Sequence, residues 1–144
     1  MTELDAALVR RKLAIIRRNI DDLGEVEGLD LAEYHADRFR LKGTERLLQE
    51  TVEAAVDANL HLLRAAGRAT PGDYFMSFVE LGPAGIVSEE LASRLAPSAG
   101  LRNRLVHEYA EIDDAIVLAA VRDARIEYSG YIAALERYLS ERGL

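Results

Sequence analysis

The 144-residue sequence contains no cysteine, and this absence excludes disulfide bonds, thiolate catalysis and thiolate metal sites. No apolar run approaches the roughly 20 residues that a membrane-spanning helix requires. The opening residues, MTELDAALVRRKL, lack the apolar centre of a secretory signal. We therefore expect a cytoplasmic protein that does not span a membrane.

Basic residues are in short supply: Lys and Arg number 18 against 25 Asp and Glu, a net charge of −7 at pH 7. Bulk charge thus disfavours long-range attraction of nucleic acid, and contact with RNA needs a local basic patch. One such cluster lies near the N-terminus: Arg10, Arg11, Lys12, Arg17 and Arg18. An RNA surface would include this cluster, although an ordinary solvated helix face has the same composition.

Proline is also rare, and the long stretches before and after the three prolines show helical periodicity. Their apolar stripes include Val9, Leu13, Ile16, Ile20 and Leu23 near the N-terminus and Val117, Val121, Ala124, Tyr128, Tyr131, Leu135 and Tyr138 near the C-terminus. The chain length and the 49% apolar content predict one folded domain over residues 1–144. We predict an all-α, up-and-down helical bundle with two long helices and short connecting helices. The expected helices cover residues 3–24, 30–66, two short segments between Pro71 and Pro97, 98–108 and 113–142.

The ends of these helices carry recognisable signals. Gly24 supplies a stop for the first helix, and Asp73 and Ser88 are N-cap candidates for the two short ones. Gly43 lies inside the long 30–66 stretch, where glycine costs about 1 kcal/mol relative to alanine. One helix bent at Gly43 and two stacked helices both fit the pattern.

Residues 102–109, with the sequence RNRLVHEY, concentrate ionisable side chains. An Arg can hold phosphate oxygens in a bidentate fork, and a His can transfer protons near neutral pH. Because the 2′-hydroxyl of RNA is a built-in nucleophile, Arg102 and His107 would suffice for phosphodiester cleavage without a metal. By itself, however, this spacing is more often found on an ordinary helix surface.

Helix geometry limits how these residues can cooperate. Asn103 and His107 are four positions apart and share one face, whereas Arg102 lies on another. Arg102 and His107 could still meet around one phosphate if the Arg side chain reaches round, or if a two-fold dimer places two copies of this helix side by side.

A second polar line follows the long 30–66 stretch at intervals of three and four residues: Arg46, Glu50, Glu53, Asp57, His61 and Arg64. Such a line usually faces solvent. We keep Asp57 as a supporting site candidate, because it could orient the His61 imidazole or meet a partner's Arg. Glu53, Asp57 and His61 do not complete a coordination sphere, so we assign no metal and no cofactor. His35 is interpreted as structural or exposed.

The string from Arg102 and Asn103 through His107 to Tyr109 resembles the RN-x-x-x-H-x-Y signature of HEPN domains of the HepT-like group. The resemblance extends over most of the chain. Residues 45–61 look like the long second helix of that family, and residues 71–86 are similar to its connector.

The resemblance implies a toxin ribonuclease of a toxin–antitoxin pair that forms a homodimer, with Arg102 and His107 at a cleft made by both subunits and Asn103 in support. The partner would be a minimal (MNT) nucleotidyltransferase antitoxin that transfers AMP from ATP onto Tyr109 and so blocks the cleft with negative charge. Related HEPN domains also serve as non-catalytic adaptors that dimerise and bind a nucleotidyltransferase or a nucleotide, and this alternative remains open.

Overall fold

The computed structural model describes residues 2–108 and 110–144, and these residues form helices joined by turns, with no β-strand among them. The all-α prediction is therefore confirmed. The helices are α1 (Ala6–Asp22), α2 (Gly24–Glu27), α3 (Leu31–Ala36), α4 (Arg38–Ala65), α5 (Tyr74–Val79), α6 (Glu89–Leu95), α7 (Pro97–His107) and α8 (Asp114–Ser140).

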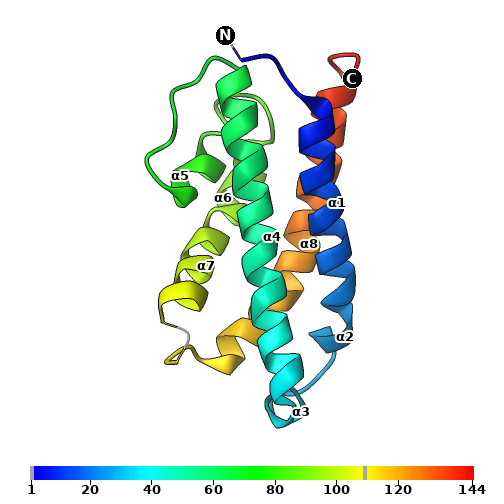
Figure 1. Ribbon diagram of the computed structural model, residues 1–144, viewed down its shortest axis with the longest axis vertical. Coiled ribbons are helices and arrows are strands. Elements are labelled where there is room, and N and C mark those ends of the chain that lie inside the picture. Colours follow the sequence, from blue (N-terminus) through cyan, green and yellow to red (C-terminus); the bar gives the residue numbers. More distant parts are fainter. Residues whose placement is uncertain (1, 109) are drawn as a thin grey trace.

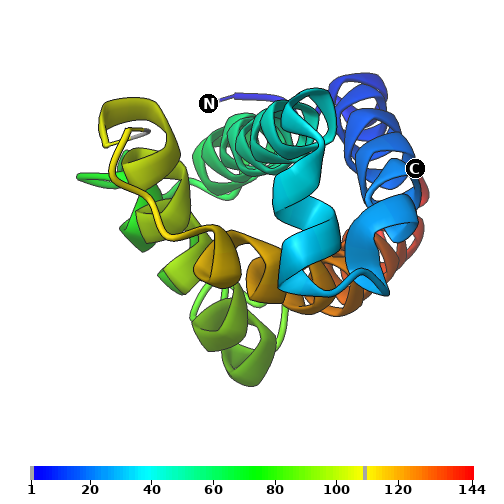
Figure 2. The ribbon, with the colours of Figure 1, turned by 90° about the horizontal axis from the view of Figure 1, so that it is seen from below.

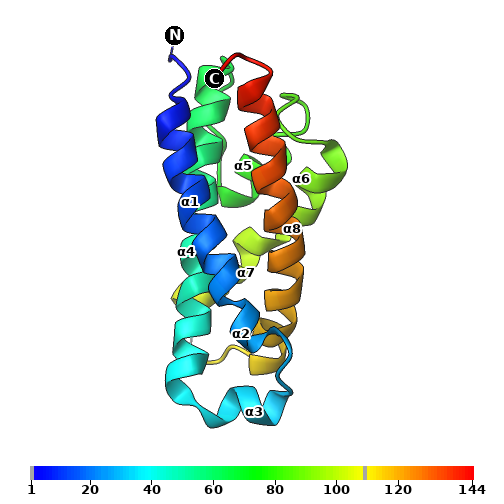
Figure 3. The same ribbon diagram turned by 90° about the vertical axis from the view of Figure 1, so that its right-hand side faces the viewer.

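The three longest helices, α1, α4 and α8, run alongside one another and form the body of the molecule (Figures 1 and 3). Helices α5, α6 and α7 lie on one side of α4, and α1 lies on the other (Figure 1). At the end opposite the two termini, α3 crosses between α4 and α8 and closes the bundle (Figures 2 and 3). The predicted pair of long helices is α4 and α8. No helix in the described part of the chain is long and apolar enough to cross a membrane.

The core is built from the apolar stripes that the periodicity predicts. In α8 the whole stripe is buried: Val117, Val121, Ala124, Tyr128, Tyr131, Leu135 and Tyr138. In α1 the same holds for Val9, Leu13, Ile16 and Ile20. Burial of these side chains provides the main driving force for packing the three long helices together.

The long 30–66 stretch is two helices, and the break falls at Asp37 and not at Gly43. Asp37 has an extended backbone (φ −112°, ψ 103°), and its carboxylate accepts a hydrogen bond of 3.2 Å from the backbone N–H of Arg40. This N-cap starts α4 and satisfies a donor that a new helix would otherwise leave free. Gly43 lies within α4 and ends no helix, so of the two alternatives the two-helix arrangement is the one observed.

Gly24, the expected stop of the first helix, instead opens α2, because α1 already ends at Asp22. The two predicted N-caps are confirmed. Asp73 accepts from the backbone N–H of Met76 at 2.8 Å, and Ser88 accepts from that of Leu91 at 3.1 Å. Helix α1 is shorter than expected, because Asp5 caps it by accepting from Leu8 at 3.0 Å.

The exposed His35 on α3 has a partner that sequence spacing did not reveal. Its Nδ1 lies 2.6 Å from Oδ2 of Asp114, the first residue of α8. This contact joins α3 to α8 at the closed end of the bundle.

Candidate functional site

Helix α7 carries the Arg–His string, and its packing decides where each of these side chains points. Pro97 occupies its first turn, where the missing N–H costs nothing, and its buried residues Ala99 and Leu105 anchor it in the bundle. The helix packs against α4 and α5. Arg102 is on the side of α7 that meets these two helices.

Three side chains contact the guanidinium of Arg102, a residue whose side chain is only 17% exposed. Nη2 lies 3.5 Å from Oε2 of Glu53 on α4. Cζ lies 4.9 Å from the centroid of the Tyr74 ring on α5. Nη1 donates to Oδ1 of Asn103 at 3.3 Å. The guanidinium is therefore held by an ion pair, a ring face and an amide, while its buried Nε finds no hydrogen-bond partner in the described part of the structure.

His107 has a contrasting environment. It is the last residue of α7 and is exposed, and its imidazole makes no hydrogen bond or ion pair with residues 2–108 or 110–144. Five positions separate it from Arg102, which corresponds to about 140° around the helix axis. The two side chains therefore leave α7 in different directions within one copy of the chain.

The supporting candidate Asp57 pairs with a residue of α1. Its Oδ2 accepts a hydrogen bond of 2.9 Å from Nζ of Lys12. Nε2 of His61 instead accepts from the backbone N–H of Asp5 at 2.9 Å. The structure thus brings Asn103 to Arg102, whereas Asp57 forms no hydrogen bond or ion pair with His61 or Arg102.

Tyr109 lies outside the described residues, between α7 and α8 in the sequence. Among the residues described, no three His, Asp or Glu side chains converge in a way that could hold a metal ion.

Sequence reasoning did not identify Glu53 and Tyr74 as neighbours of Arg102. Glu53 belonged to the polar line on the long helix and was considered only for metal binding. Tyr74 is an aromatic residue at the start of a short helix. No local spacing connects either residue with α7, because both contacts depend on how separate helices pack.

A chain of buried hydrogen bonds fixes α5 behind this site. Oη of Tyr131 donates to Oδ1 of Asn59 at 2.6 Å, and Nδ2 of Asn59 donates to Oγ of Ser77 at 3.4 Å. Oγ of Ser77 in turn donates to the backbone oxygen of Tyr74 at 2.7 Å. Burial raises the pKa of the Tyr131 phenol well above its usual value, so this residue stays a neutral donor.

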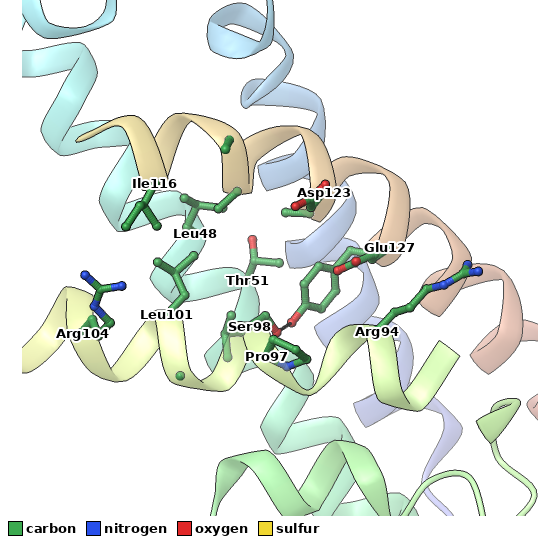
Figure 4. Close-up of a pocket in the computed structure, with 16 residues that line it drawn as sticks. Leu48, Thr51, Arg94, Pro97, Ser98, Leu101, Arg104, Ile116, Asp123 and Glu127 are labelled. Atoms are coloured by element: carbon green, nitrogen blue, oxygen red, sulfur yellow. Dashed lines mark hydrogen bonds between the residues drawn. The ribbon is translucent and has the colours of Figure 1, made fainter. Parts of the chain in front are cut away.

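A separate cavity of about 640 Å³ opens between α4, α7 and α8 (Figure 4). Leu48, Leu101 and Ile116 form an apolar end, and Ser98 and Tyr128 share a hydrogen bond of 2.7 Å in its wall. Neither Arg102 nor His107 lines this cavity. It is therefore distinct from the candidate site.

The helical bundle and its Arg–His helix define the class of protein as an all-α HEPN domain. The fold is shared with a solved structure of a tri-AMPylated HEPN toxin from Shewanella oneidensis in complex with its MNT antitoxin. That similarity has a TM-score of 0.82 at 25% identity, and it covers 93% of this chain and 99% of the toxin.

The family follows from sequence comparison. The profile described as "Ribonuclease HepT-like" matches residues 16–139. The chain is 38% identical to the tRNA nuclease HepT of Aphanizomenon flos-aquae, over 96% of this chain and 95% of the relative. It is 28% identical to the mRNA nuclease HepT of Shewanella oneidensis, over 90% and 96%. The chain belongs to the HepT-like ribonuclease family, which confirms the resemblance seen in its sequence.

Proposed function

We propose that this chain is the toxin of a toxin–antitoxin pair and acts in the cytoplasm as a metal-independent endoribonuclease. The observation that supports this most strongly is the contrast along α7. Arg102 is held in place by Glu53, Tyr74 and Asn103, whereas His107 on the same helix is exposed. A fixed cation and an accessible imidazole are two of the groups that RNA cleavage needs, together with an acid for the leaving oxygen.

In the proposed reaction the 2′-oxygen of RNA attacks the adjacent phosphorus, and the bond from phosphorus to the 5′-oxygen breaks. One imidazole takes the proton from the 2′-hydroxyl, and an acid returns a proton to the leaving 5′-oxygen. Arg102 stabilises the charge that builds on the phosphate oxygens, and Asn103 supports its guanidinium. The products are a 2′,3′-cyclic phosphate and a 5′-hydroxyl.

A homodimer accounts for the divergent directions of the two side chains. Since about 140° separates Arg102 from His107 around α7, the Arg of one copy and the His of another can face a single phosphate. Mixing inactive Arg102→Ala and His107→Ala proteins tests this arrangement. If the site is shared between subunits, mixed dimers regain activity, because one of their two sites combines Arg102 from one chain with His107 from the other. If the site lies within one chain, mixed dimers stay inactive.

The proposed antitoxin is an MNT nucleotidyltransferase that transfers AMP to Tyr109. Support comes from the Shewanella toxin, which is AMPylated in its complex with MNT antitoxin, and from the position of Tyr109 two residues after His107. An AMP group there would bring negative charge and bulk to the RNA-binding cleft. Intact mass after incubation with ATP and antitoxin should increase by whole AMP units in the wild type, and this increase should be absent in Tyr109→Phe.

A non-catalytic adaptor is the second candidate, because the folded bundle could dimerise and bind a nucleotidyltransferase without cleaving RNA. Comparing RNA cleavage by the wild type, Arg102→Ala and His107→Ala separates the two functions. Loss of cleavage in both variants supports the ribonuclease. A clean wild-type preparation without activity, together with normal binding of the antitoxin, supports the adaptor.

A further inference from the structure

Tyr74 contacts Arg102 through its aromatic ring, whereas the other neighbours of this guanidinium contact it through polar groups. Cζ of Arg102 lies over the Tyr74 ring, 4.9 Å from its centroid. A ring face attracts a cation without placing an oxygen acceptor beside its N–H groups. Glu53 and Asn103, in contrast, place oxygens beside Nη2 and Nη1. Tyr74 can therefore hold the guanidinium in position without adding an acceptor that competes with a phosphate.

The ring has a rigid support. Tyr74 opens α5, a helix of six residues, and such a short helix depends on tertiary contacts for its position. The hydrogen-bond chain from Tyr131 through Asn59 and Ser77 ends on the backbone oxygen of Tyr74. Asn59, Ser77 and Tyr131 are all fully buried. The backbone that carries the ring is thus attached through α4 to the centre of α8.

We propose that Tyr74 is a positioning residue for the ribonuclease reaction, which holds the Arg102 guanidinium where its N–H groups meet the scissile phosphate. This inference rests on the proposed function of Arg102. A bidentate contact requires two N–H groups aligned with two phosphate oxygens, and rotation of the plane would break that alignment. The cost of losing Tyr74 should therefore fall on the chemical step more than on RNA binding.

The test compares two substitutions of Tyr74 in RNA cleavage assays. Tyr74→Leu keeps apolar volume but removes the aromatic face, and kcat should fall about fivefold to thirtyfold with a smaller change in KM. Tyr74→Phe retains the ring and should keep kcat within about twofold of the wild type, because the ring face is what attracts the cation. Phe75→Leu, a change at an exposed aromatic residue of the same helix, is the matched control and should leave kcat unchanged.

A second variant keeps the test decisive if Tyr74→Leu fails to fold, which urea unfolding would reveal. Ser77→Ala retains the aromatic ring of Tyr74 but removes the hydrogen bond to the backbone oxygen of Tyr74, so the ring is held less firmly. We expect kcat to fall by a few fold while the protein stays folded. A folded Tyr74→Leu protein with wild-type kcat would overturn the inference, as would a Tyr74→Phe protein as slow as Tyr74→Leu. Neither result would affect the proposed function, which is tested separately by the activity of the wild type, of Arg102→Ala and of His107→Ala.

Discussion

Glu53 and Arg102 form an ion pair between α4 and α7, with 3.5 Å between Oε2 and Nη2. In the free protein, this carboxylate lies beside the cation that the proposed reaction needs for a phosphate. An incoming RNA must therefore overcome a like charge before it reaches Arg102. Both side chains are partly exposed, at 34% for Glu53 and 17% for Arg102, so solvent weakens this repulsion without abolishing it.

Replacing Glu53 with Gln should tighten the binding of RNA. The amide keeps a hydrogen-bond acceptor beside Arg102 but removes the negative charge, and one partly exposed charge pair is worth about 0.2 to 1 kcal/mol. We expect the KM for RNA cleavage to fall, by up to about fivefold. Glu50→Gln removes one charge from the neighbouring turn of α4, where Glu50 pairs with Arg46 at 3.0 Å, and KM should stay unchanged. An increase of KM in Glu53→Gln would show that the carboxylate assists RNA binding.

The basic cluster on α1 contains two kinds of cation. Arg10 pairs with Glu136 at 3.3 Å and Lys12 with Asp57 at 2.9 Å, so these charges are already compensated. Arg11, Arg17 and Arg18 are exposed, and none of them forms an ion pair within the described part of the chain. The second group is thus available to RNA phosphates.

Substitution of the exposed arginines should reduce the salt dependence of RNA binding. Each phosphate contact contributes about 0.7 to the slope of log K against log salt for a single strand. Arg11→Gln and Arg18→Gln together should lower the slope measured by fluorescence anisotropy by about 1.4. Arg10→Gln with Lys12→Gln removes the same number of charges and should change the slope less. Equal changes in the two double variants would mean that only net charge matters.

The stability of the bundle should decline at alkaline pH because of its buried tyrosines. Burial raises the pKa of Tyr128 and Tyr131, whereas in the unfolded chain a phenol ionises near pH 10. The folded state therefore retains these protons longer than the unfolded state. The stabilisation is fully present below about pH 10 and is lost above it, by about 1.4 kcal/mol per pH unit for each tyrosine.

Urea unfolding at about pH 9 and about pH 11 measures this effect. Tyr131→Phe should be less stable than the wild type at neutral pH, because Asn59 loses its donor, but its free energy of unfolding should fall less steeply above about pH 10. An equal pH dependence in the wild type and the variant would rule out Tyr131 as a contributor.

The helices could be predicted from the sequence because periodicity and capping act locally. The apolar stripe of α8, from Val117 to Tyr138, is buried as predicted, and Asp73 and Ser88 cap the helices that they were expected to cap. The position of the break in the long 30–66 stretch was not predicted. Asp37 starts a new helix through a side-chain hydrogen bond to the backbone of Arg40, whereas Gly43 is accommodated inside α4.

The site could be predicted only in part, because its motif residues are adjacent in the sequence whereas the neighbours of Arg102 are brought to it by the packing of separate helices. Arg102, Asn103, His107 and Tyr109 stand close together in the sequence, so their pattern is visible there. The surroundings of Arg102 come from α4 and α5, and no periodicity predicts which residues of these helices face α7. Asp57 shows the same limit, since its position on a polar helix face does not reveal that it faces Lys12.

RNA cleavage by purified wild type and His107→Ala, each incubated with total RNA in the presence of a chelator, tests the central claim most directly. The wild type should produce fragments that end in 2′,3′-cyclic phosphate, because the 2′-hydroxyl is the nucleophile and no metal takes part. His107→Ala should bind RNA but produce none of these fragments. Equal cleavage by the two proteins, or cleavage by the wild type that stops in chelator, would contradict the account.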